Sequence, residues 1–461
     1  MKIGIIGAGA AGLAAAYDLA KNGHAVAVYE RSPFVGGQAS TFDVGGAPLE
    51  RGYHHLFTSD TDMVDLVHEI GLGDRMRWIE STVGTFHGGK IYNFVSALDL
   101  LRFKPLSLLG RVRLGLLTLY LQRKKDWKDF EDITAHEWLL KRAGRRGYEA
   151  FWGPLLRGKF GERYYDQVGM TWVWGKIHTR FASRGKGLGR EKLGYPIDSF
   201  GEVFDVLADE ITQSGGRVET STTVSRVAVD EGRVAGLSTR ETPATWISPQ
   251  PLTYQPDPPE ANDTSVEQYQ DFDAVIATSP SYVLPKLVEG LPAEYLAKLT
   301  GTEYLSAVLV ILVLDRPLSN VYWLNVADRS IPFVGVIEQT NFLSPDQYGG
   351  RHIVYLSNYL GREDPLYGMA HSELLREYIP HLRKINPDFD EAWIQESYHH
   401  RVDAAQPIVG VNYSSRIPDH RTPVTGLYLA NTTQVYPEDR GTNYSVRMGR
   451  RVARMLMDDL A

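Results

Sequence analysis

The first thirty residues carry the pattern that most constrains the fold: a strand, a glycine-rich turn, a helix and a second strand. Residues 2–6 are apolar and predict a short buried strand, and glycines follow at positions 7, 9 and 12. Residues 13–21 predict a helix and residues 25–29 a second strand, which Glu30 follows. In such a unit the glycines serve the tight turn, the approach of an anion to the helix N-terminus and the helix–strand contact. The sequence therefore predicts a dinucleotide site, with Glu30 accepting hydrogen bonds from the adenosine ribose.

A pair of glycines, Gly36 and Gly37, follows six residues after Glu30. This extended signature resembles that of the FAD-dependent amine oxidase, protoporphyrinogen oxidase and carotenoid (phytoene) desaturase superfamily, with some likeness to UDP-galactopyranose mutase. The resemblance implies FAD as the cofactor, with the glycines bringing backbone and a basic side chain to the pyrophosphate and the flavin. Members usually have Arg or Lys after the pair. Here Gln38 stands at that position, and Arg31 is expected to supply the charge.

The C-terminal segment predicts the other end of the FAD site. Residues 426–430 predict an apolar strand, which Asn431 follows, and residues 441–460 predict a helix. By resemblance, N–H groups at the start of that helix point at the flavin pyrimidine, where reduced flavin carries negative charge. The family's Gly-Asp is replaced here by Ala430-Asn431. Asn431 is therefore expected to bind a ribityl hydroxyl or a phosphate without adding charge.

The string from Glu50 to Phe57 resembles the segment that lies beside the isoalloxazine ring in plant-type carotenoid desaturases and UDP-galactopyranose mutases. His54 matches the histidine of that segment and is the candidate catalytic residue. It could donate to the flavin, act as an acid or base, or hold the loop. A covalent link to the flavin and a core histidine satisfied by backbone stay open as alternatives.

We expect FAD to be bound non-covalently by residues from all of these motifs. Val224 joins them from a predicted hairpin over residues 220–238, and Thr278 from the end of a predicted strand over residues 271–278. The predicted cofactor-binding residues are Gly7, Gly9, Ala10, Ala11, Gly12, Glu30, Arg31, Gly36, Gly37, Gln38, Arg51, Gly52, Tyr53, His54, Val224, Thr278, Asn431, Gly441, Thr442, Asn443 and Tyr444.

Two long segments lie outside these motifs. Residues 80–195 are expected to be mainly helical, and residues 281–415 to mix strands, such as 306–314, with helices, such as 372–384. The resemblance implies an α/β fold, in which a Rossmann-like FAD-binding domain is interleaved with a mixed α+β substrate domain containing a helical, basic segment. The expected ranges are 1–80, 196–280 and 416–461 for the FAD-binding domain, 81–195 and 281–415 for the substrate domain, and 241–270 for a surface loop rich in Pro, Thr and Asn.

Charge is distributed unevenly along the chain. Residues 100–192 contain 21 Lys and Arg against 9 Asp and Glu, a net charge of +12, although the whole chain carries −7. Within this segment, residues 100–125 interleave basic residues with leucines and contain no acid. The pattern suits an anionic bilayer surface, and it equally suits a helix with an apolar core face and a solvated basic face. We expect a cytoplasmic protein, with peripheral contact at the inner face of the membrane through residues 100–125 as one of these two alternatives.

Several polar residues are candidates for binding substrate. Basic residues of the +12 segment could clamp a diphosphate, namely Arg157, Lys159, Arg163, Arg180 and Arg184. Near the C-terminal motif, Glu438, Asp439 and Arg440 either face a polar substrate or hold their loop through ion pairs. The predicted substrate-binding residues are Arg157, Lys159, Arg180 and Tyr436.

Several residue types and patterns are absent from the sequence, and their absence excludes some classes of site and function. The chain has no cysteine, which excludes disulfides, redox thiols and a cysteinyl–flavin link. Its histidines and carboxylates show no metal-ligand spacing, so no metal site is expected. A net charge of −7 gives no indication of nucleic-acid binding. No apolar stretch approaches the roughly 20 residues of a membrane span.

The favoured function is an FAD-dependent oxidoreductase, of the oxidase, dehydrogenase or desaturase type. It would remove hydride from a largely apolar small molecule to flavin N5 and be re-oxidised by O₂, a quinone or another acceptor. The alternatives are an isomerase like UDP-galactopyranose mutase, an amine oxidase, and a non-catalytic flavoprotein interaction module. Amine oxidases have a Tyr where this chain has Thr442. The substrate, the electron acceptor and the oligomeric state are left open.

Overall fold

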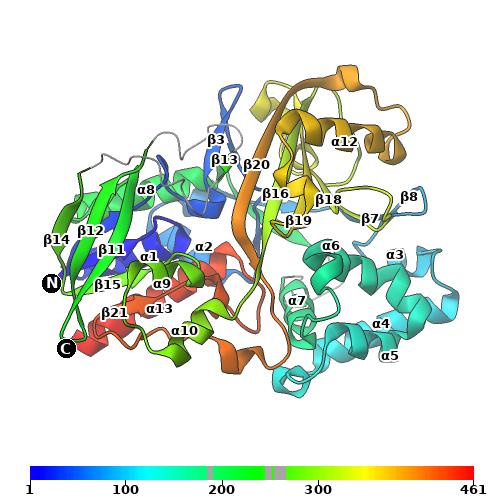
Figure 1. The fold of residues 1–461 in the computed structure, drawn as a ribbon. Coiled ribbons are helices and arrows are strands. Elements are labelled where there is room, and N and C mark those ends of the chain that lie inside the picture. Colours follow the sequence, from blue (N-terminus) through cyan, green and yellow to red (C-terminus); the bar gives the residue numbers. More distant parts are fainter. Residues whose placement is uncertain (184–190, 244–251, 254–265, 461) are drawn as a thin grey trace.

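The computed structural model describes residues 1–183, 191–243, 252–253 and 266–460. Its elements form two halves, of which one contains both chain ends and the other is built on a larger sheet (Figure 1). The helices are α1 (Ala10–Lys21), α2 (Thr61–Glu69), α3 (Ala97–Arg102), α4 (Leu108–Arg123), α5 (Ala135–Gly147), α6 (Gly153–Tyr164), α7 (Met170–Ala182), α8 (Ser199–Gln213), α9 (Leu284–Leu287), α10 (Ala293–Thr300), α11 (Pro365–Gly368), α12 (His371–Ile385) and α13 (Thr442–Leu460). The strands are β1 (Lys2–Ile6), β2 (Ala25–Tyr29), β3 (Thr41–Val44), β4 (Ala47–Glu50), β5 (Leu56–Phe57), β6 (Met76–Glu80), β7 (Val83–His87), β8 (Lys90–Asn93), β9 (Lys192–Pro196), β10 (Arg217–Glu219), β11 (Thr222–Asp230), β12 (Arg233–Glu241), β13 (Leu252–Thr253), β14 (Gln268–Asp271), β15 (Ala274–Ala277), β16 (Tyr304–Leu314), β17 (Trp323–Val326), β18 (Gly335–Glu338), β19 (His352–Leu360), β20 (Ile394–Pro407) and β21 (Leu427–Leu429).

A parallel five-stranded sheet of order β10-β2-β1-β15-β21 forms the core of the first half. Its strands come from the two ends and the middle of the sequence, and β1 lies at the centre. The apolar strands β1, β2 and β15 are almost wholly buried, as a parallel sheet covered on both faces requires. The strands predicted over residues 2–6, 25–29 and 426–430 are thereby confirmed.

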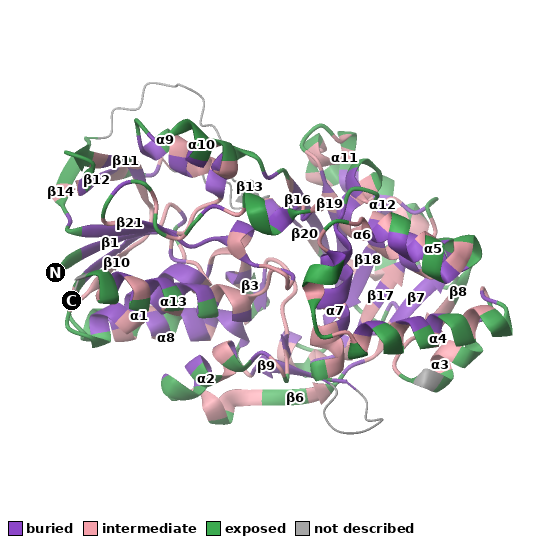
Figure 2. Ribbon diagram, turned by 90° about the horizontal axis from the view of Figure 1, so that it is seen from below, coloured by how far each residue is buried: buried purple, intermediate pink, exposed green. Residues whose placement is uncertain are grey.

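Helices cover one face of this sheet and a second, smaller sheet covers the other (Figure 2). Ile3 and Ile5 of β1 pack into the core formed with α1, α8 and α13, whereas Ile6 packs with β12 and α9. The predicted hairpin is confirmed as β11 and β12, with Glu231 and Gly232 at positive φ in its turn.

The second half is built on an eight-stranded sheet of order β13-β20-β16-β19-β18-β17-β7-β8. Its central strand β16 is buried along ten of its eleven residues and pairs antiparallel with β19 and β20. The apolar face of α12 packs on this sheet through Leu374, Tyr378 and Leu382. The strand predicted over residues 306–314 and the helix predicted over 372–384 are confirmed.

The helices α3 to α7 share a core of their own. The prediction that residues 80–195 are mainly helical holds from α3 to α7 and is wrong before residue 97. There, β7 and β8 extend the large sheet, because β7 pairs in parallel with β17 and antiparallel with β8.

The packing differs from the predicted domain boundaries in two places. Residues 281–415 were assigned to the substrate domain, yet α9 and α10 bury Leu284, Leu287 and Leu299 against the dinucleotide sheet. The predicted surface loop at 241–270 lies largely outside the described residues, but its end forms β14, which pairs with β12. The α/β fold class is confirmed, and the remaining domain ranges stay a prediction.

Candidate active site

The turn between β1 and α1 is closed too tightly for a side chain at Gly12, where a Cβ atom would lie 2.0 Å from the Gly7 carbonyl oxygen. Gly7 has a φ of +103°, which favours glycine. Gly9 is the N-cap residue of α1, and no side chain of the described residues caps the helix there. The first N–H groups of α1, from Ala10, Ala11 and Gly12, therefore remain for a ligand, and the helix dipole favours an anion.

The second glycine pair packs against this turn. The Gly36 N–H donates to the Ala8 carbonyl at 2.8 Å, and Gly36 forms an isolated β-bridge with Gly9. A Cβ atom at Gly37 would lie 3.1 Å from the Gly9 Cα, so a side chain there would intrude between the two loops. The paired glycine loops form a cradle of bare backbone, which fits the pyrophosphate of a dinucleotide.

Glu30 stands at the C-terminal end of β2, the sheet edge at which open α/β folds bind nucleotides. Its Oε2 accepts from the Ala8 N–H at 2.9 Å and its Oε1 from the Ser32 N–H at 2.7 Å. These bonds fix the carboxylate beside the glycine turn and leave lone pairs for ribose hydroxyls. Thr278 follows β15, which pairs with β1, and its hydroxyl donates to the Ile6 carbonyl at 2.8 Å. Val224 is buried on β11, and Arg31 is partly exposed after Glu30.

Asn431 is almost fully buried at the end of β21. Its Nδ2 donates to the Ser279 carbonyl at 2.9 Å, and its Oδ1 accepts from the Thr433 N–H at 3.1 Å. The side chain therefore ties the loop after β15 to the turn after β21. Its predicted contact with the cofactor stays a prediction.

The start of α13 is fixed by its neighbours. Gly441 precedes Thr442, the first residue of the helix. The Asn443 Oδ1 accepts from the Met63 N–H at 2.9 Å, and the Tyr444 hydroxyl lies 3.3 Å from Thr179 Oγ1. The helix N-terminus is thus anchored to α2 and α7, where its dipole can face the anionic part of a cofactor.

Glu50 organises the segment that leads into Arg51, Gly52, Tyr53 and His54. It is fully buried, and its carboxylate accepts from the Tyr195 hydroxyl at 2.8 and 2.9 Å and from the Phe200 N–H at 2.9 Å. Burial raises the pKa of Glu50 to about 7, although these hydrogen bonds act to lower it. This role is not predicted from the sequence, although an acid at the end of a short apolar strand is a usable signal.

His54 is held by its own loop. Its Nδ1 lies 2.6 Å from the Gly52 carbonyl, which can only accept, so Nδ1 carries the proton. Burial lowers the pKa of His54 to about 4, so the ring is neutral at pH 7. This arrangement favours the loop-holding role among the alternatives and leaves Nε2 as an acceptor. Any role in catalysis stays a prediction.

The rest of the segment is packed among aromatic rings. The Arg51 guanidinium lies 4.4 Å from the centre of the Phe34 ring. The Tyr53 ring meets Trp323 and Tyr355 edge to face, with centroid distances of 4.9 and 5.8 Å. These contacts fix the segment beside the second glycine loop, because the Arg51 N–H donates to the Ser40 carbonyl at 3.0 Å.

One of the predicted substrate residues, Lys159, lies in a charged cluster next to this segment. Lys159 shares Asp439 with Lys176, at N–O distances of 3.9 and 2.6 Å. Arg440 donates to Tyr359 at 3.1 Å, to Gln406 at 3.2 Å and to Gln38 at 3.5 Å. No local sequence pattern marks Lys176, Tyr359 or Gln406, because they come from the separate elements α7, β19 and β20.

The remaining basic candidates do not form a diphosphate clamp. Arg157 pairs with Glu149 and Glu162, Arg163 with Glu303 and Glu363, and Arg180 with Glu191. Arg184 lies outside the described residues. Each described arginine is thus paired with carboxylates of its own, and the role of these residues in binding substrate stays a prediction. Tyr436 donates to Glu131 at 2.6 Å, and its hydroxyl lies 3.0 Å from Thr171 Oγ1.

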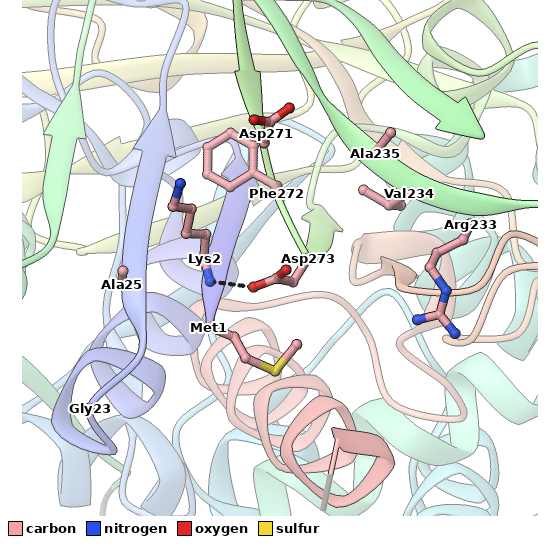
Figure 3. Close-up of a pocket in the computed structure, with 10 residues that line it drawn as sticks. All are labelled: Met1, Lys2, Gly23, Ala25, Arg233, Val234, Ala235, Asp271, Phe272 and Asp273. Carbon is pink, nitrogen blue, oxygen red and sulfur yellow. Dashed lines mark hydrogen bonds between the residues drawn. The ribbon is translucent and has the colours of Figure 1, made fainter.

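A surface hollow of about 630 Å³ lies at the opposite edge of the dinucleotide sheet (Figure 3). It is lined by Lys2, Ala25 and Asp273, which stand at the N-terminal ends of their strands. The Lys2 N–H donates to Asp273 across it at 2.8 Å. Nucleotides bind at the carboxyl edge of such sheets, so this hollow is not the cofactor site.

Among the described residues, no group of three or more His, Asp or Glu side chains is placed to hold a metal ion. Within the same part of the chain, none of the helices is both long and apolar enough to cross a membrane.

Comparison with known proteins gives consistent matches. A family model described as "Flavin containing amine oxidoreductase" matches residues 10–457. The zeta-carotene desaturase of Synechocystis sp. is 27% identical over 179 residues, 34% of this chain and 36% of that protein. The 15-cis-phytoene desaturase of Synechococcus elongatus is 39% identical over 79 residues, 17% of each chain. The alignments with the curated relatives thus cover well under two thirds of those proteins.

The fold as a whole matches solved structures. An oxidoreductase from Methanosarcina mazei superposes with a TM-score of 0.70 at 19% identity, covering 99% of this chain and 100% of that one. At this level of identity the match concerns the fold alone.

Proposed function

Because this chain belongs to the family of flavin containing amine oxidoreductases, with FAD as its cofactor, we propose that it removes hydride from a small-molecule substrate. The observation that carries the proposal is the cradle formed by Gly9, Gly36 and Gly37, with Glu30 beside it. When bound, FAD supplies a flavin ring that accepts hydride, which protein side chains cannot do.

The residues of the chain would then bind FAD and orient its flavin ring. The N-terminus of α1 would hold the pyrophosphate and Glu30 the ribose. The N-terminus of α13 would stabilise negative charge at the pyrimidine end of the flavin. Neutral His54 would hold the loop from Arg51 to His54 beside the ring. Little acid or base catalysis is needed when hydride leaves an activated carbon, which agrees with the lack of a catalytic dyad in this set.

Two alternatives are disfavoured by the same site. An amine substrate is a cation at pH 7, and Lys159, Lys176 and Arg440 would repel it. A sugar-diphosphate isomerase would need a cationic clamp, whereas Arg157, Arg163 and Arg180 are each held in ion pairs. A redox reaction on a substrate with a large apolar part therefore remains the proposal, with O₂, a quinone or another compound as electron acceptor.

The proposal is tested on the purified protein by absorbance and mass spectrometry. We expect a yellow protein that releases unmodified FAD on denaturation, and a flavin that loses its absorbance when a substrate is added without oxygen. Folded protein that stays colourless after incubation with FAD would contradict the cofactor assignment. Turnover only after chemical pre-reduction of the flavin, with no net change in its redox state, would favour the isomerase instead.

We also propose that α3 and α4 rest on an anionic lipid surface at the cytoplasmic face of a membrane. One stripe of α4, namely Leu114, Leu117 and Leu121, packs into the helical core. The opposite stripe is apolar too but exposed, with Leu108 66%, Leu109 78% and Leu116 63% accessible. Five further apolar side chains of α3 and α4 are also exposed, namely Leu98, Leu101, Val112, Leu119 and Tyr120.

Charge favours lipid over a protein partner as the occupant of this surface. Arg102, Lys104, Arg113, Arg123 and Lys125 are exposed around the outward stripe, and residues 100–125 contain no acid. An apolar stripe flanked by basic side chains matches the boundary between anionic headgroups and acyl chains. The alternative of a purely solvated basic face does not account for the exposed leucines.

A Leu109→Asp, Leu116→Asp double variant is expected to lose binding to vesicles of phosphatidylcholine and phosphatidylglycerol. Removing two inserted leucines should weaken binding by roughly 100-fold, at about 1.5 kcal/mol each. Co-sedimentation with the vesicles at physiological salt measures the binding. The control is Val266→Asp, which changes an exposed site on the other half of the protein. The proposal would be overturned if the double variant and the control sedimented with the vesicles equally well. It would also be overturned if the wild type formed a dimer that only the double variant disrupts.

A further inference from the structure

A cluster of three cations around one carboxylate lies where α6, α7, β19 and the loop before α13 meet. Asp439 is nearly buried and pairs with Lys176 at 2.6 Å and, more loosely, with Lys159 at 3.9 Å. Arg440 follows Asp439 in sequence, and its hydrogen bonds go to the amides of Gln406 and Gln38 and to the Tyr359 hydroxyl, none of which is a carboxylate. Among the described residues, the cluster therefore carries more positive charge than its one carboxylate can balance.

Lys159 is a largely buried cation that is only loosely paired with its carboxylate. Its side chain is 19% exposed, and its Nζ lies 4.2 Å from the centre of the Tyr359 ring. Burial lowers the pKa of Lys159, with Tyr359 and Asp439 acting in the opposite direction. A half-buried cation of this kind is normally balanced by a charged partner, because its desolvation is costly otherwise.

The cluster is continuous with the residues assigned to the cofactor. Gln38, which contacts Arg440, directly follows the Gly36–Gly37 pair. Arg440 directly precedes Gly441, which leads into α13. Tyr359 also meets Tyr53 of the loop that contains His54. The cations therefore lie against both segments that we assign to the flavin.

We propose that Lys159, Lys176 and Arg440 recognise an oxyanion of the substrate, a carboxylate or a phosphate. This inference rests on the proposed function, because it takes the adjoining cofactor site as the redox site. Asp439 positions the two lysines, and the rings of Tyr53, Trp172 and Tyr359 supply an aromatic wall for the rest of the molecule. The substrate class is thus an amphiphile with one anionic group, rather than a pure hydrocarbon or an amine.

Tyr359 makes this recognition dependent on pH. Burial acts to raise the pKa of Tyr359, but Lys159, Arg440 and the hydrogen bond with Tyr53 outweigh it and hold the pKa at about 7. Asp439 and Lys176 interact in turn with Lys159, and Asp439 also interacts with Arg440. Above pH 7 the ionised Tyr359 would act as an internal anion and occupy the cations that a ligand needs.

The sign of the effect follows from this competition. Binding of an oxyanion returns Tyr359 to its neutral form, so the ligand and a proton bind together. Affinity should be greatest below pH 7 and fall by up to about tenfold per pH unit above it. The Tyr359→Phe variant has no hydroxyl to ionise at this position. It should therefore bind the oxyanion at every pH as tightly as the wild type does at pH 6.

Titration calorimetry on the FAD-loaded protein tests the inference with four probes that share one ring: benzoate, phenyl phosphate, benzyl alcohol and benzylamine. We expect benzoate or phenyl phosphate to bind, which also decides between carboxylate and phosphate, and the alcohol and the amine to bind at least tenfold more weakly. Equal binding of the neutral and anionic probes would overturn it.

Variants separate charge recognition from folding. Lys159→Met should weaken binding of the anionic probe at least tenfold, Lys159→Arg should largely restore it, and Lys141→Met, at an exposed site on α5, should leave it unchanged. FAD content is measured on every sample. Protein without FAD contradicts the proposed function, whereas FAD-loaded Lys159→Met with wild-type affinity for the anion contradicts only this inference.

Discussion

A Gly9→Ala variant is expected to fold normally and to be purified almost without FAD. Gly9 has a φ of −82°, which alanine adopts freely, and a Cβ atom there would come no closer than 3.9 Å to the Gly37 Cα. The fold therefore tolerates the methyl group. The group projects, however, into the space at the N-terminus of α1 where a pyrophosphate must approach the N–H groups.

The size of the loss follows from the hydrogen bonds that the methyl group displaces. Hydrogen bonds to a charged group contribute about 1.5 to 3 kcal/mol each, so losing two weakens FAD binding by roughly 100-fold or more. The ratio of FAD to protein and a titration of the cofactor-free protein measure it. Gly368→Ala is the matched control, because its Cβ meets nothing within 4 Å in the described structure. A Gly9→Ala protein with a full complement of FAD would refute the assigned pyrophosphate site.

Glu50→Gln is expected to become more stable relative to the wild type as pH rises from 5 to 8. The pKa of Glu50 is about 7 in the folded protein and 4.5 for an unperturbed carboxyl. Between these values the folded state holds a proton that the unfolded state has released, so the wild type loses stability as pH rises through the window. The loss is roughly 1 kcal/mol per pH unit, or about 3 kcal/mol in all, and glutamine cannot show it.

Denaturant unfolding of both proteins at saturating FAD, from pH 5 to pH 8, measures this difference. Glu377→Gln is the control, because Glu377 is exposed on α12 and stays in contact with water in both states. A constant difference between Glu50→Gln and the wild type across the range would mean that the buried carboxylate is already fully ionised at pH 5.

The dinucleotide half could be predicted from sequence because local signals agree there. The spacing of Gly7, Gly9 and Gly12 follows from backbone contacts, such as the 2.0 Å that would separate a Cβ at Gly12 from the Gly7 carbonyl oxygen. Such contacts are set within a dozen residues, so they leave a mark on the sequence. The role of the Asn431 side chain is harder to predict. Its amide is hydrogen-bonded to the backbone of Ser279 and of Thr433, which lie on two different loops.

The charged cluster could not be predicted in the same way. Lys159, Tyr359 and Arg440 are separated by 200 and 81 residues, and only the packing of three elements brings them together. The leucines of α4 were ambiguous for a different reason. Both faces of that helix are apolar, so the pattern alone could not tell Leu114, which is buried, from Leu116, which is exposed.

The order of strands in the dinucleotide sheet bears on how the protein is made. β1 is made some 270 residues before its neighbour β15, with Ile5 opposite Ile276. The helix α13 comes last and packs so closely on α1 that a Cβ at Gly449 would lie 2.1 Å from the Ala11 carbonyl oxygen. Until β15 has been made, β1 has one unpaired edge, and until α13 has been made, the face of α1 that packs on it stays uncovered. The turn that is assigned to the pyrophosphate can therefore reach its final packing only after α13 has been made, which delays formation of the cofactor site relative to its own sequence motif.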